Sequence, residues 1–566
     1  MHINQRTHNQ FNRRQFLKGA GLLSLALAGG GAASVLSACT YAPPSAPIAG
    51  AQPPAAPTAA PVTLPPSAQT TAPAAAAADL ELALKATRGQ VGILPGAETA
   101  VWRYQAELLA GDPASVVALP GSYLGPILRV RQGQRVRVRF TNDLPEPSIV
   151  HWHGLLVPDA MDGHPRFAVG AGQSYAYDFQ VVNRAGTYWF HPHPHRLTGG
   201  QAYRGLAGLL IVSDDEEAAL GLPQGEYDQP LVIQDRQFDA QNQLVYLAQG
   251  GGMMDGGMDQ MMGFLGDRIL VNGQPDFTLP VATRAYRLRL LNGSNSRIYM
   301  LAWRDGKPLT VIATDGGLLE QPVQRPFVML APGERVELWA DFAGRKSGDE
   351  LFLDSQKFVG AEGAELMGGM GGMGSMMTQP AALPNGAAFP VARFRVARAA
   401  QGGQTRRQRL ARIERYRLAD AVNAARPRQV VITNRMMAWL LNGRSFEMSG
   451  VAADEVGRVG ELAVWEFVNQ RNPGQMMEQN GMAHPLHIHG TQFQVLERQA
   501  LPELRAGFES VRAGYVDEGW KDTVLVMPGE RVKVLLKFVH PGLFLYHCHN
   551  LEHEDQGMMR NFRVDA

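Results

Sequence analysis

The histidines of this sequence are placed where they could build a metal centre. The chain has 15 histidines, and none of them lies between His195 and His484. Eleven of the 15 form four short groups: His151 and His153; His191, His193 and His195; His484, His487 and His489; and His547, His549 and His553. Because residues i and i+2 of a strand face the same side, each His-x-His pair can present two imidazoles to one metal cluster. Ordinary buried histidines would explain one such pair but not four.

A cysteine in the last group indicates that the metal is copper. Two imidazoles, one thiolate and a weak axial thioether make a blue-copper electron-transfer site. The candidate ligands for such a site are His484, Cys548, His553 and Met558. Zinc is the rival metal, but structural zinc sites usually take several thiolates, and the only other cysteine is Cys39, far away in the sequence. The residue types therefore favour copper.

Eight histidines remain once the blue-copper ligands are set aside. They are His151, His153, His191, His193, His487, His489, His547 and His549. A cluster of three coppers needs a set of imidazoles of this size. Cys548 lies directly between His547 and His549. An electron that enters at Cys548 would therefore have a short covalent route to the cluster.

The segments that must position these ligands have the pattern of β-strands. Val136, Val138 and Phe140 alternate with arginines, and this period of two turns one face of the segment inward. Similar stretches occur at 286–290 and at 464–468. Each stretch leads into a turn that contains asparagine. We therefore expect many short strands rather than long helices.

Internal similarity predicts how these strands are divided into domains. The sequence Pro-Gly-Glu-Arg-Val occurs at 332–336 and again at 528–532. Similarity at such a spacing indicates duplicated β-domains rather than a short-period repeat. We place the three domains at residues 80–218, 225–398 and 408–566.

Composition limits the classes of function. Hydrophobic residues make up 45% of the chain and charged residues 19%, which is enough for several cores and excludes wholesale disorder. The formal net charge is +1, without the basic excess of a nucleic-acid binder. We therefore expect no nucleic-acid partner.

The N-terminal segment predicts export rather than a folded domain. A twin-arginine pair stands at 13–14, and the segment that follows ends in Leu-Ser-Ala-Cys, which resembles a bacterial lipobox that would be acylated on Cys39. An ordinary signal peptide cut after Ala38 is the alternative. We predict a signal peptide at 1–38 and a Pro/Ala-rich tether at 39–79. The body would then be periplasmic or extracytoplasmic and held to a membrane by its lipid anchor.

Four motifs together resemble those of the multicopper oxidases, and most closely the bacterial laccase and cuprous-oxidase branch. The motifs are His151-Trp152-His153-Gly154, Trp189-Phe190-His191-Pro192-His193, His484-Pro485-Leu486-His487-Ile488-His489-Gly490 and His547-Cys548-His549-Asn550-Leu551-Glu552-His553. The resemblance covers roughly residues 90–566. It implies an all-β fold of three cupredoxin-like Greek-key β-sandwich domains. The blue (type 1) copper would lie in the third domain, and three further coppers between the first and the third.

The resemblance also implies a role for each ligand and for the enzyme. By motif position, the type 2 ligands are His151 and His487, and the two type 3 sets are His153, His191 and His549, and His193, His489 and His547. His195 is expected to support the ligands rather than bind metal. The implied enzyme holds four coppers per chain. It couples one-electron oxidation of phenols, aryl amines and Cu(I) to the four-electron reduction of O2 to water.

Two carboxylates are candidates for proton delivery, because reduction of O2 to water consumes protons as well as electrons. Asp162 matches an acid near the type 2 copper in similar bacterial enzymes. Glu554, directly after His553, matches a proton-delivering acid of that branch. The alternative for each is a plain surface carboxylate.

Two methionine-rich segments leave the choice of substrate open. One contains Met253, Met254, Met258, Met261 and Met262, and the other Met367, Met370, Met373, Met376 and Met377. Thioethers suit Cu(I), and the alternative is a flexible loop of adaptable apolar residues. Asn480 stands where cuprous oxidases often carry an acid, and Glu365 is a candidate substitute.

Three other functions remain to be weighed against an oxidase. A copper-binding or copper-tolerance protein would use the methionine segments to sequester metal, but it would not need Cys548 between two ligands. A two-domain nitrite reductase would lack the set of eight histidines. A non-catalytic relative of the same fold would have lost ligands, and here none is missing.

Overall fold

The structure is a computed structural model that describes residues 77–566 apart from 120, 248–259, 361–382, 401–403, 436–437 and 470–480. Residues 74–566 form one compact unit. The predicted signal peptide, nearly all of the predicted tether, and most of both methionine-rich segments lie outside the described residues, as do Glu365 and Asn480. Among the helices that are described, none has the length and apolar character needed to span a membrane.

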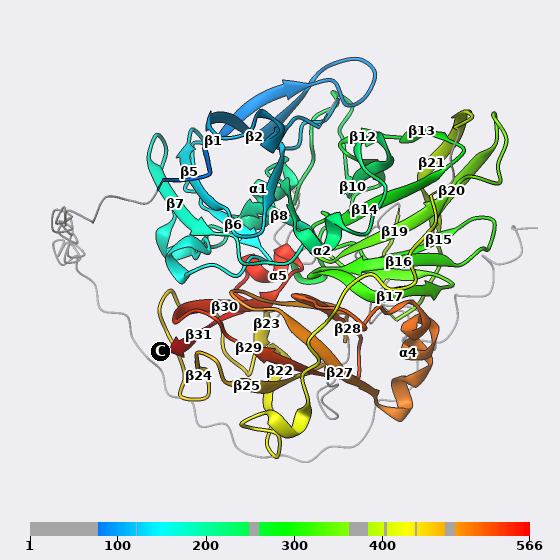
Figure 1. The fold of residues 1–566 in the computed structure, drawn as a ribbon. Coiled ribbons are helices and arrows are strands. Elements are labelled where there is room, and N and C mark those ends of the chain that lie inside the picture. The colour runs from blue at the N-terminus through cyan, green and yellow to red at the C-terminus, as the bar shows by residue number, and fades with distance from the viewer. Residues whose placement is uncertain are drawn as a thin grey trace, which may run out of the picture. The chain divides into compact units, whose positions relative to one another are not determined.

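The described chain forms six β-sheets, which Figure 1 shows as three consecutive groups coloured blue to cyan, green, and yellow to red. One sheet of the first group has the order β2(Thr99–Ala110), β1(Leu80–Val91), β5(Arg135–Asn142) and β7(Ser174–Gln180). The other has the order β3(Val116–Val117), β4(Ile127–Arg131), β9(Gly208–Ser213), β8(Gly186–Pro192) and β6(Val150–His153). Both sheets contribute to one buried cluster, so they form a β-sandwich.

The second group of strands makes the middle sandwich. One sheet has the order β12(Gln274–Pro275), β11(Arg268–Val271), β10(Asp228–Arg236), β14(Ala285–Asn292), β19(Arg335–Asp341), β16(Leu309–Thr314) and β17(Gly317–Arg325). The facing sheet has the order β13(Thr278–Ala282), β21(Phe389–Arg398), β20(Glu350–Ser355), β15(Tyr299–Trp303) and β18(Val328–Leu330). One buried cluster again draws on both sheets.

The third group completes the fold. One sheet has the order β23(Ala438–Leu441), β22(Arg428–Arg435), β25(Leu462–Val468), β29(Glu530–Lys537) and β27(Phe493–Ala500). The other has the order β24(Val456–Arg458), β31(Met559–Asp565), β30(Gly542–Cys548), β26(His484–Ile488) and β28(Thr523–Val526). Three sandwiches in sequence confirm the predicted all-β fold. Each predicted domain contains one sandwich, while the boundaries at 80–218, 225–398 and 408–566 stay a prediction.

Helices are short and few among the described residues. They are α1(Thr198–Tyr203), α2(Asp215–Ala218), α4(Arg505–Val511) and α5(Leu551–Asp555). Helix α5 follows β30 and contacts α1 of the first sandwich. Figure 1 shows α5, in red, between the cyan strands of the first sandwich and the orange strands of the third. The side chain of Asn550 caps α5 by accepting a hydrogen bond from the backbone N–H of His553.

The alternation predicted at 135–140 is confirmed in β5. Val136, Val138 and Phe140 are at most 2% exposed. The intervening Arg137 lies on the outer face, where it pairs with Asp178. A strand with one apolar face is what a sheet covering a single core requires.

The similar pattern in β14 has a different outcome, because both faces of this strand are buried. Arg287 and Arg289, the expected outward residues, are each 2% exposed. Arg289 forms two hydrogen bonds with Asp228 and one with Thr187 Oγ1 of the first sandwich. The first sandwich therefore covers this face, and buried arginines persist there because carboxylates pair with them.

Candidate metal centre

Cys548 lies in a buried group with two histidines. Its Sγ is 3.5 Å from Nδ1 of His484 and 3.6 Å from Nδ1 of His553, and all three side chains are fully buried. His484 begins β26 and Cys548 ends β30, which is paired with it, while His553 lies on α5. Ligand bonds of about 2.0–2.3 Å put neighbouring ligand atoms about 3–4 Å apart. One metal ion therefore fits among these three atoms.

Met558 and Trp439 lie around this group. Met558 is buried in the same apolar cluster as Cys548, and its predicted role as axial ligand stays a prediction. The Trp439 ring centroid is 4.6 Å from that of His484, and sequence reasoning missed this residue. Trp439 Nε1 donates to the carbonyl of Met261, and His553 Nε2 lies 2.9 Å from the same oxygen. His553 Nε2 therefore carries the proton, which leaves Nδ1 free for a metal.

The other histidines converge between the first and the third sandwich. The groups whose ligand atoms lie within 4.8 Å of one another include His153, His191 and His549; His193, His489 and His547; and His151, His153 and His487. Nε2 of His151 is 3.4 Å from Nε2 of His487. Each of these eight side chains is at most 1% exposed. The structure therefore brings together all eight histidines that the sequence singled out.

Strand register explains why these histidines meet. His151 of β6 is directly opposite His191 of β8. His487 of β26 is directly opposite His547 of β30. Each His-x-His pair turns both imidazoles to one face of its strand. Two adjacent strands from each sandwich therefore present their histidines to the same space.

Backbone carbonyls orient four of the eight imidazoles. Nδ1 donates to a carbonyl in four of them: His151 to Asp162 at 2.6 Å, His191 to Pro192 at 2.9 Å, His487 to Asp522 at 2.8 Å and His547 to Cys548 at 3.1 Å. Nε2 of these rings is left without a proton and faces the other histidines. His153 is reversed, because its Nε2 lies 3.0 Å from Asp522 Oδ1 and its Nδ1 lies 3.4 Å from Nε2 of His191.

Several buried ring nitrogens have no hydrogen-bond partner among the described residues. They are His193 Nδ1, His484 Nε2 and both nitrogens of His549. Buried polar atoms are normally hydrogen-bonded, so these exceptions need an explanation. A metal ion explains the nitrogen of His549 that faces His153 and His191, while His193 Nδ1 and His484 Nε2 lie on the far side of rings whose other nitrogen faces a ligand. Imidazole with thiolate suits copper. The residues present therefore fit copper ions at both places.

Burial keeps these groups in the forms that precede metal binding. It lowers the pKa of His191 and His553 to about 3 and that of His547 to about 4. The imidazoles are therefore neutral, which is the form that binds metal. Burial also raises the pKa of the Cys548 thiol. A bound cation would reverse that preference and displace the thiol proton.

Asp162 is not a surface carboxylate, since its side chain is fully buried. Its Oδ2 accepts a hydrogen bond from His489 Nδ1 at 2.7 Å, and its carbonyl accepts one from His151. Its Oδ1 has no hydrogen-bond partner among the described residues. Burial, followed by the nearby Asp159, raises the pKa of Asp162 well above its usual range.

Glu554 is likewise buried, at 1% exposure. Its Oε1 lies 3.5 Å from His193 Nε2, and its Oε2 lies 3.2 Å from His547 Nδ1. Burial, followed by the nearby Asp555, raises the pKa of Glu554 well above its usual range. Both acids thus touch the histidine cluster, while their part in proton delivery stays a prediction.

The middle sandwich also contacts the centre, which the sequence did not indicate. Glu552, between Leu551 and His553 on α5, accepts hydrogen bonds from Asn295 Nδ2 and Tyr246 OH, each at 2.8 Å. Asp522 contacts His153, as described above.

His195 is half-buried beside Phe446, with ring centroids 5.0 Å apart, and belongs to none of the groups formed by the described residues.

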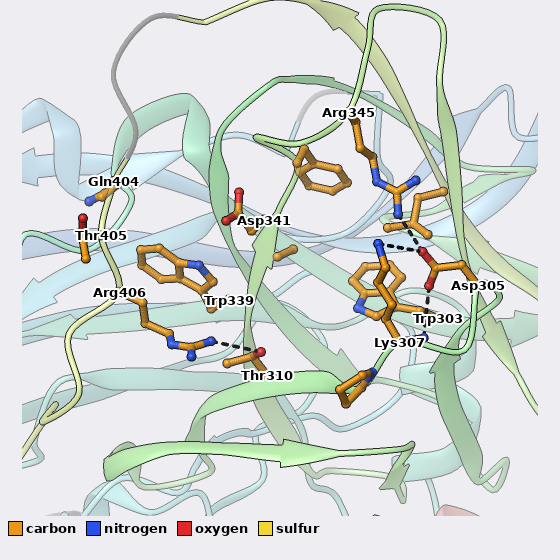
Figure 2. Close-up of a pocket in the computed structure, with 14 residues that line it drawn as sticks. Trp303, Asp305, Lys307, Thr310, Trp339, Asp341, Arg345, Gln404, Thr405 and Arg406 are labelled. Carbon is orange, nitrogen blue, oxygen red and sulfur yellow. Dashed lines mark hydrogen bonds and ion pairs between the residues drawn. The ribbon is translucent and has the colours of Figure 1, made fainter.

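Two cavities of the described structure lie elsewhere. One, of about 790 Å³, is lined by residues of the first sandwich and by residues 243–246. The other, of about 510 Å³, lies in the middle sandwich, where Figure 2 shows Trp303 and Trp339 on either side. Asp305 in its wall is paired with Arg345 at 2.7 Å and with Lys307 at 3.7 Å. None of the residues that line it is a candidate ligand. The candidate ligands themselves are buried.

Comparison with known proteins agrees with this centre. Residues 101–217 and 421–566 each match a family model described as multicopper oxidase. The multicopper oxidase mco of Staphylococcus aureus is 29% identical over 458 residues, which cover 81% of this chain and 86% of that protein. The bilirubin oxidase of Albifimbria verrucaria is 30% identical over 491 residues, which cover 82% of this chain and 77% of that protein.

A solved structure extends the agreement to the fold. McoA multicopper oxidase from the hyperthermophile Aquifex aeolicus is 33% identical, with a TM-score of 0.69 over 87% of this chain and 97% of that one. The three sandwiches are therefore cupredoxin-like. Given these matches and the buried histidine and cysteine groups, the chain belongs to the multicopper oxidase family and is a copper oxidoreductase that uses O2.

Proposed function

We propose that the enzyme couples the one-electron oxidation of phenols, aryl amines and Cu(I) to the four-electron reduction of O2 to water. It would use four coppers: a type 1 copper at His484, Cys548, His553 and Met558, a type 2 copper at His151 and His487, and two type 3 coppers. The type 3 ligands would be His153, His191 and His549 for one ion, and His193, His489 and His547 for the other.

One observation carries this proposal. Cys548 belongs to one ligand group, while its direct neighbours His547 and His549 belong to the other groups. When bound, copper would supply one-electron transfer at the Cys548 group and reduction of O2 at the histidine cluster. His547 and His549 are the residues directly before and after Cys548 in the sequence, so the backbone links the two places covalently. The chain also excludes water, since all of these side chains are buried.

Asp162 and Glu554 would hold the protons that O2 reduction consumes. Each acid is buried, and Asp162 is hydrogen-bonded to His489 while Glu554 Oε1 lies 3.5 Å from His193 Nε2. A buried carboxyl keeps its proton at a pH where an exposed one is ionised. These acids could therefore store a proton within reach of the histidines and release it as negative charge develops there.

Asp162→Asn and Glu554→Gln should each lower the turnover number by about 10²-fold, the lower end of the range for general acid–base catalysis. Both substitutions keep the side-chain volume, so we expect the copper content to be unchanged. Asp228→Asn is the matched control, because Asp228 is also a buried carboxylate but binds Arg289 instead of a histidine. Turnover should be measured where O2 reduction limits the rate, together with copper content. Wild-type turnover in both variants would remove the two acids from the mechanism.

Oxidation of Cu(I) would depend on the methionine-rich segments. Met261, at the end of the first segment, reaches the type 1 group, since its carbonyl binds both His553 and Trp439. The second segment lies outside the described residues. Organic reductants need only an accessible edge near the type 1 histidines, whereas Cu(I) needs soft ligands that bind it.

Replacing the five methionines of the segment 363–377 by leucine should lower Cu(I) oxidation by about tenfold, equivalent to about 1.4 kcal/mol. Phenol oxidation should be unchanged, because leucine keeps the length and apolar character of the segment. Deleting 363–377 should also impair Cu(I) oxidation while sparing or raising phenol oxidation. The measurement is O2 uptake with each substrate at full copper content. Equal losses on both substrates would leave a general laccase as the better description, and copper uptake without turnover would favour a copper-binding role.

We also propose that the protein is exported by the twin-arginine route and anchored to a membrane through an acylated Cys39. The support is the sequence of residues 1–79 alone. The wild type should partition with membranes after export, and Cys39→Ser should be released as active soluble protein. A wild type that is entirely soluble after export would refute the anchor.

A further inference from the structure

A short segment of the third sandwich, Trp520–Thr523, is held by the middle sandwich. The carbonyl of Trp520 accepts hydrogen bonds from Thr314 Oγ1 at 2.9 Å and from the Gly316 N–H at 2.8 Å. Both donors lie at the turn between β16 and β17. The middle sandwich thus fixes where this segment begins.

Asp315 of the same turn holds the rest of the segment. Its Oδ2 accepts hydrogen bonds from the N–H groups of Asp522 and Thr523 at 3.3 and 3.4 Å. The Lys521 ammonium lies 3.2 Å from the same oxygen. Asp315 is fully buried, so water does not compete for these bonds. Every residue from 520 to 523 is therefore tied to the middle sandwich.

Arg335 of β19 locks the Asp522 side chain. Its Nη1 and Nη2 donate to Asp522 Oδ1 and Oδ2 at 2.7 and 2.6 Å. The remaining donors reach the carbonyls of Thr187, Gly333 and Asp315 at 2.9–3.0 Å. A guanidinium has five N–H donors in a rigid fork, and all five are used here. Arg335 therefore joins all three sandwiches at one point.

The Asp522 side chain also contacts His153. Asp522 Oδ1 lies 3.0 Å from His153 Nε2, and Thr523 Oγ1 donates to the same carboxylate oxygen at 3.0 Å. Because a carboxylate can only accept, Nε2 of His153 carries the ring proton. Nδ1 is then the free nitrogen, and it lies 3.4 Å from Nε2 of His191.

His153 differs in this respect from four of its neighbours, whereas His489, like His153, is held by a carboxylate of another sandwich. Backbone carbonyls orient the rings of His151, His191, His487 and His547 through Nδ1. A carbonyl of the same sandwich holds its position as long as the local backbone does. The orientation of His153 instead depends on a side chain of the third sandwich, which an arginine of the middle sandwich holds in place.

Gly154 shows how closely Arg335 and Asp522 are packed against the backbone next to His153. Its φ is 87°, and a Cβ there would lie 2.4 Å from Asp522 Oδ2 and 2.8 Å from Arg335 Nη2. A side chain at residue 154 would therefore displace the ion pair. Glycine directly after His153 lets the buried carboxylate and guanidinium approach the backbone.

We propose that the Arg335–Asp522 pair is a positioning device through which the middle sandwich sets the tautomer and ring orientation of His153. The pair acts on the cluster through His153. The inference rests on the proposed function in one respect, namely that His153 is a metal ligand. It gives the middle sandwich, which supplies none of the candidate ligands, a part in building the histidine cluster.

The tautomers can be measured on the full-length, metal-free protein. Solid-state NMR of protein labelled with ¹⁵N-histidine distinguishes protonated from unprotonated ring nitrogens, and loss of a signal in His153→Gln assigns that residue. We expect His153 to be protonated on Nε2 and His151, His191, His487 and His547 on Nδ1. Because no copper is present, the result does not depend on activity. Finding the proton of His153 on Nδ1 in the wild type would overturn the proposal.

Variants test whether the Arg335–Asp522 ion pair sets the tautomer of His153. Arg335→Gln should convert the single His153 tautomer into a mixture, and Arg335→Lys, which keeps the positive charge, should restore part of the Nε2–H form. Arg289→Gln is the matched control, since Arg289 is an equally buried arginine with two hydrogen bonds to an aspartate, and that aspartate contacts no histidine in the described structure. The control should be destabilised without any change at His153.

The possible outcomes are distinct. An unchanged His153 tautomer in folded Arg335→Gln would refute the role of the pair. If Arg335→Gln does not fold, the wild-type spectrum and Asp522→Asn decide, because the asparagine amide has a single acceptor oxygen where the carboxylate offers two oxygens to Arg335 and His153. In that variant the single His153 tautomer should give way to a mixture. Failure of the proposed oxidase function would appear differently, as a copper-loaded wild type that lacks the blue band while its tautomers agree with the prediction.

Discussion

Cys548→Ser is expected to abolish the blue colour and to lower oxidase activity by more than about 100-fold. Loss of a residue that only supports a metal ligand usually lowers activity by about 10- to 100-fold. The thiolate is the soft ligand of the proposed type 1 copper, and a serine hydroxyl neither ionises readily nor suits this metal. Cys548 Sγ lies 3.5 and 3.6 Å from its two histidine partners. The substitution is small, so the fold should persist with about 1–3 kcal/mol of lost stability from the buried hydroxyl.

Absorption spectroscopy and metal analysis test this expectation. Wild type should bind about four coppers per chain and Cys548→Ser about three, because the histidine cluster keeps its own ligands. Cys39→Ser makes the same chemical change at the only other cysteine and should keep both the colour and the four coppers. A colourless wild type replete with copper would contradict the assignment. So would a Cys548→Ser protein that retains the thiolate band.

The metal-free protein should lose stability steeply as the pH falls from 7 to 5, while the copper-loaded protein should resist. Burial depresses the folded-state pKa of His191 and His553 to about 3 and of His547 to about 4. Unfolded histidine has a pKa of about 6.5. The unfolded chain therefore binds protons in this range and the folded chain does not. Stability is fully present above about pH 6.5 and is lost as the pH falls toward the folded-state values.

The size of the effect follows from linkage. One pH unit below 6.5, each of these histidines costs about 1.4 kcal/mol, so three cost about 4 kcal/mol. That is a large part of the 5–15 kcal/mol that typically stabilises a native protein. It should lower the melting temperature by about 4 °C. The other cluster histidines, with pKa values lowered in the same direction, add to it.

Scanning calorimetry of both forms at pH 7.5, 6.5 and 5.5 provides the test. A coordinated imidazole cannot take up a proton without losing its metal, so copper should suppress the decline. The buried acids act in the opposite direction, since burial raises the pKa of Asp555 to about 8 and also raises that of Glu554. These acids are present in both forms. Parallel declines of the two melting temperatures would show that the histidines are not the cause.

Local patterns in the sequence were enough to predict the strands. The alternation at 135–140, 286–290 and 464–468 falls in β5, β14 and β25. It succeeds because side chains of a strand alternate between two faces, so one buried face leaves a period of two. In β14 the pattern predicted the strand but not its surroundings. Arg287 and Arg289 are buried against the first sandwich, and no local pattern records what covers an outer face.

The candidate ligands could also be named from the sequence. Their chemistry is carried by residue type and by spacings of one or two positions, and such spacings act within a single strand. The eight histidines and the Cys548 group are therefore found together in the structure as expected. Met253, Met254, Met258 and the second methionine-rich segment lie outside the described residues, so their proposed part in copper handling rests on sequence.

The tertiary structure decided how each ligand is held. Asp522 and Arg335 lie 369 and 182 positions from His153, and Trp439 lies 45 from His484; nothing in their own neighbourhoods marks an aspartate or an arginine as buried beside a metal site. Which ring nitrogen is free depends on the partner of the other nitrogen. That partner is set by how the sandwiches pack and by strand register. The sequence by itself therefore determined which candidate ligands come together, and only the packing of the three sandwiches determined their orientation.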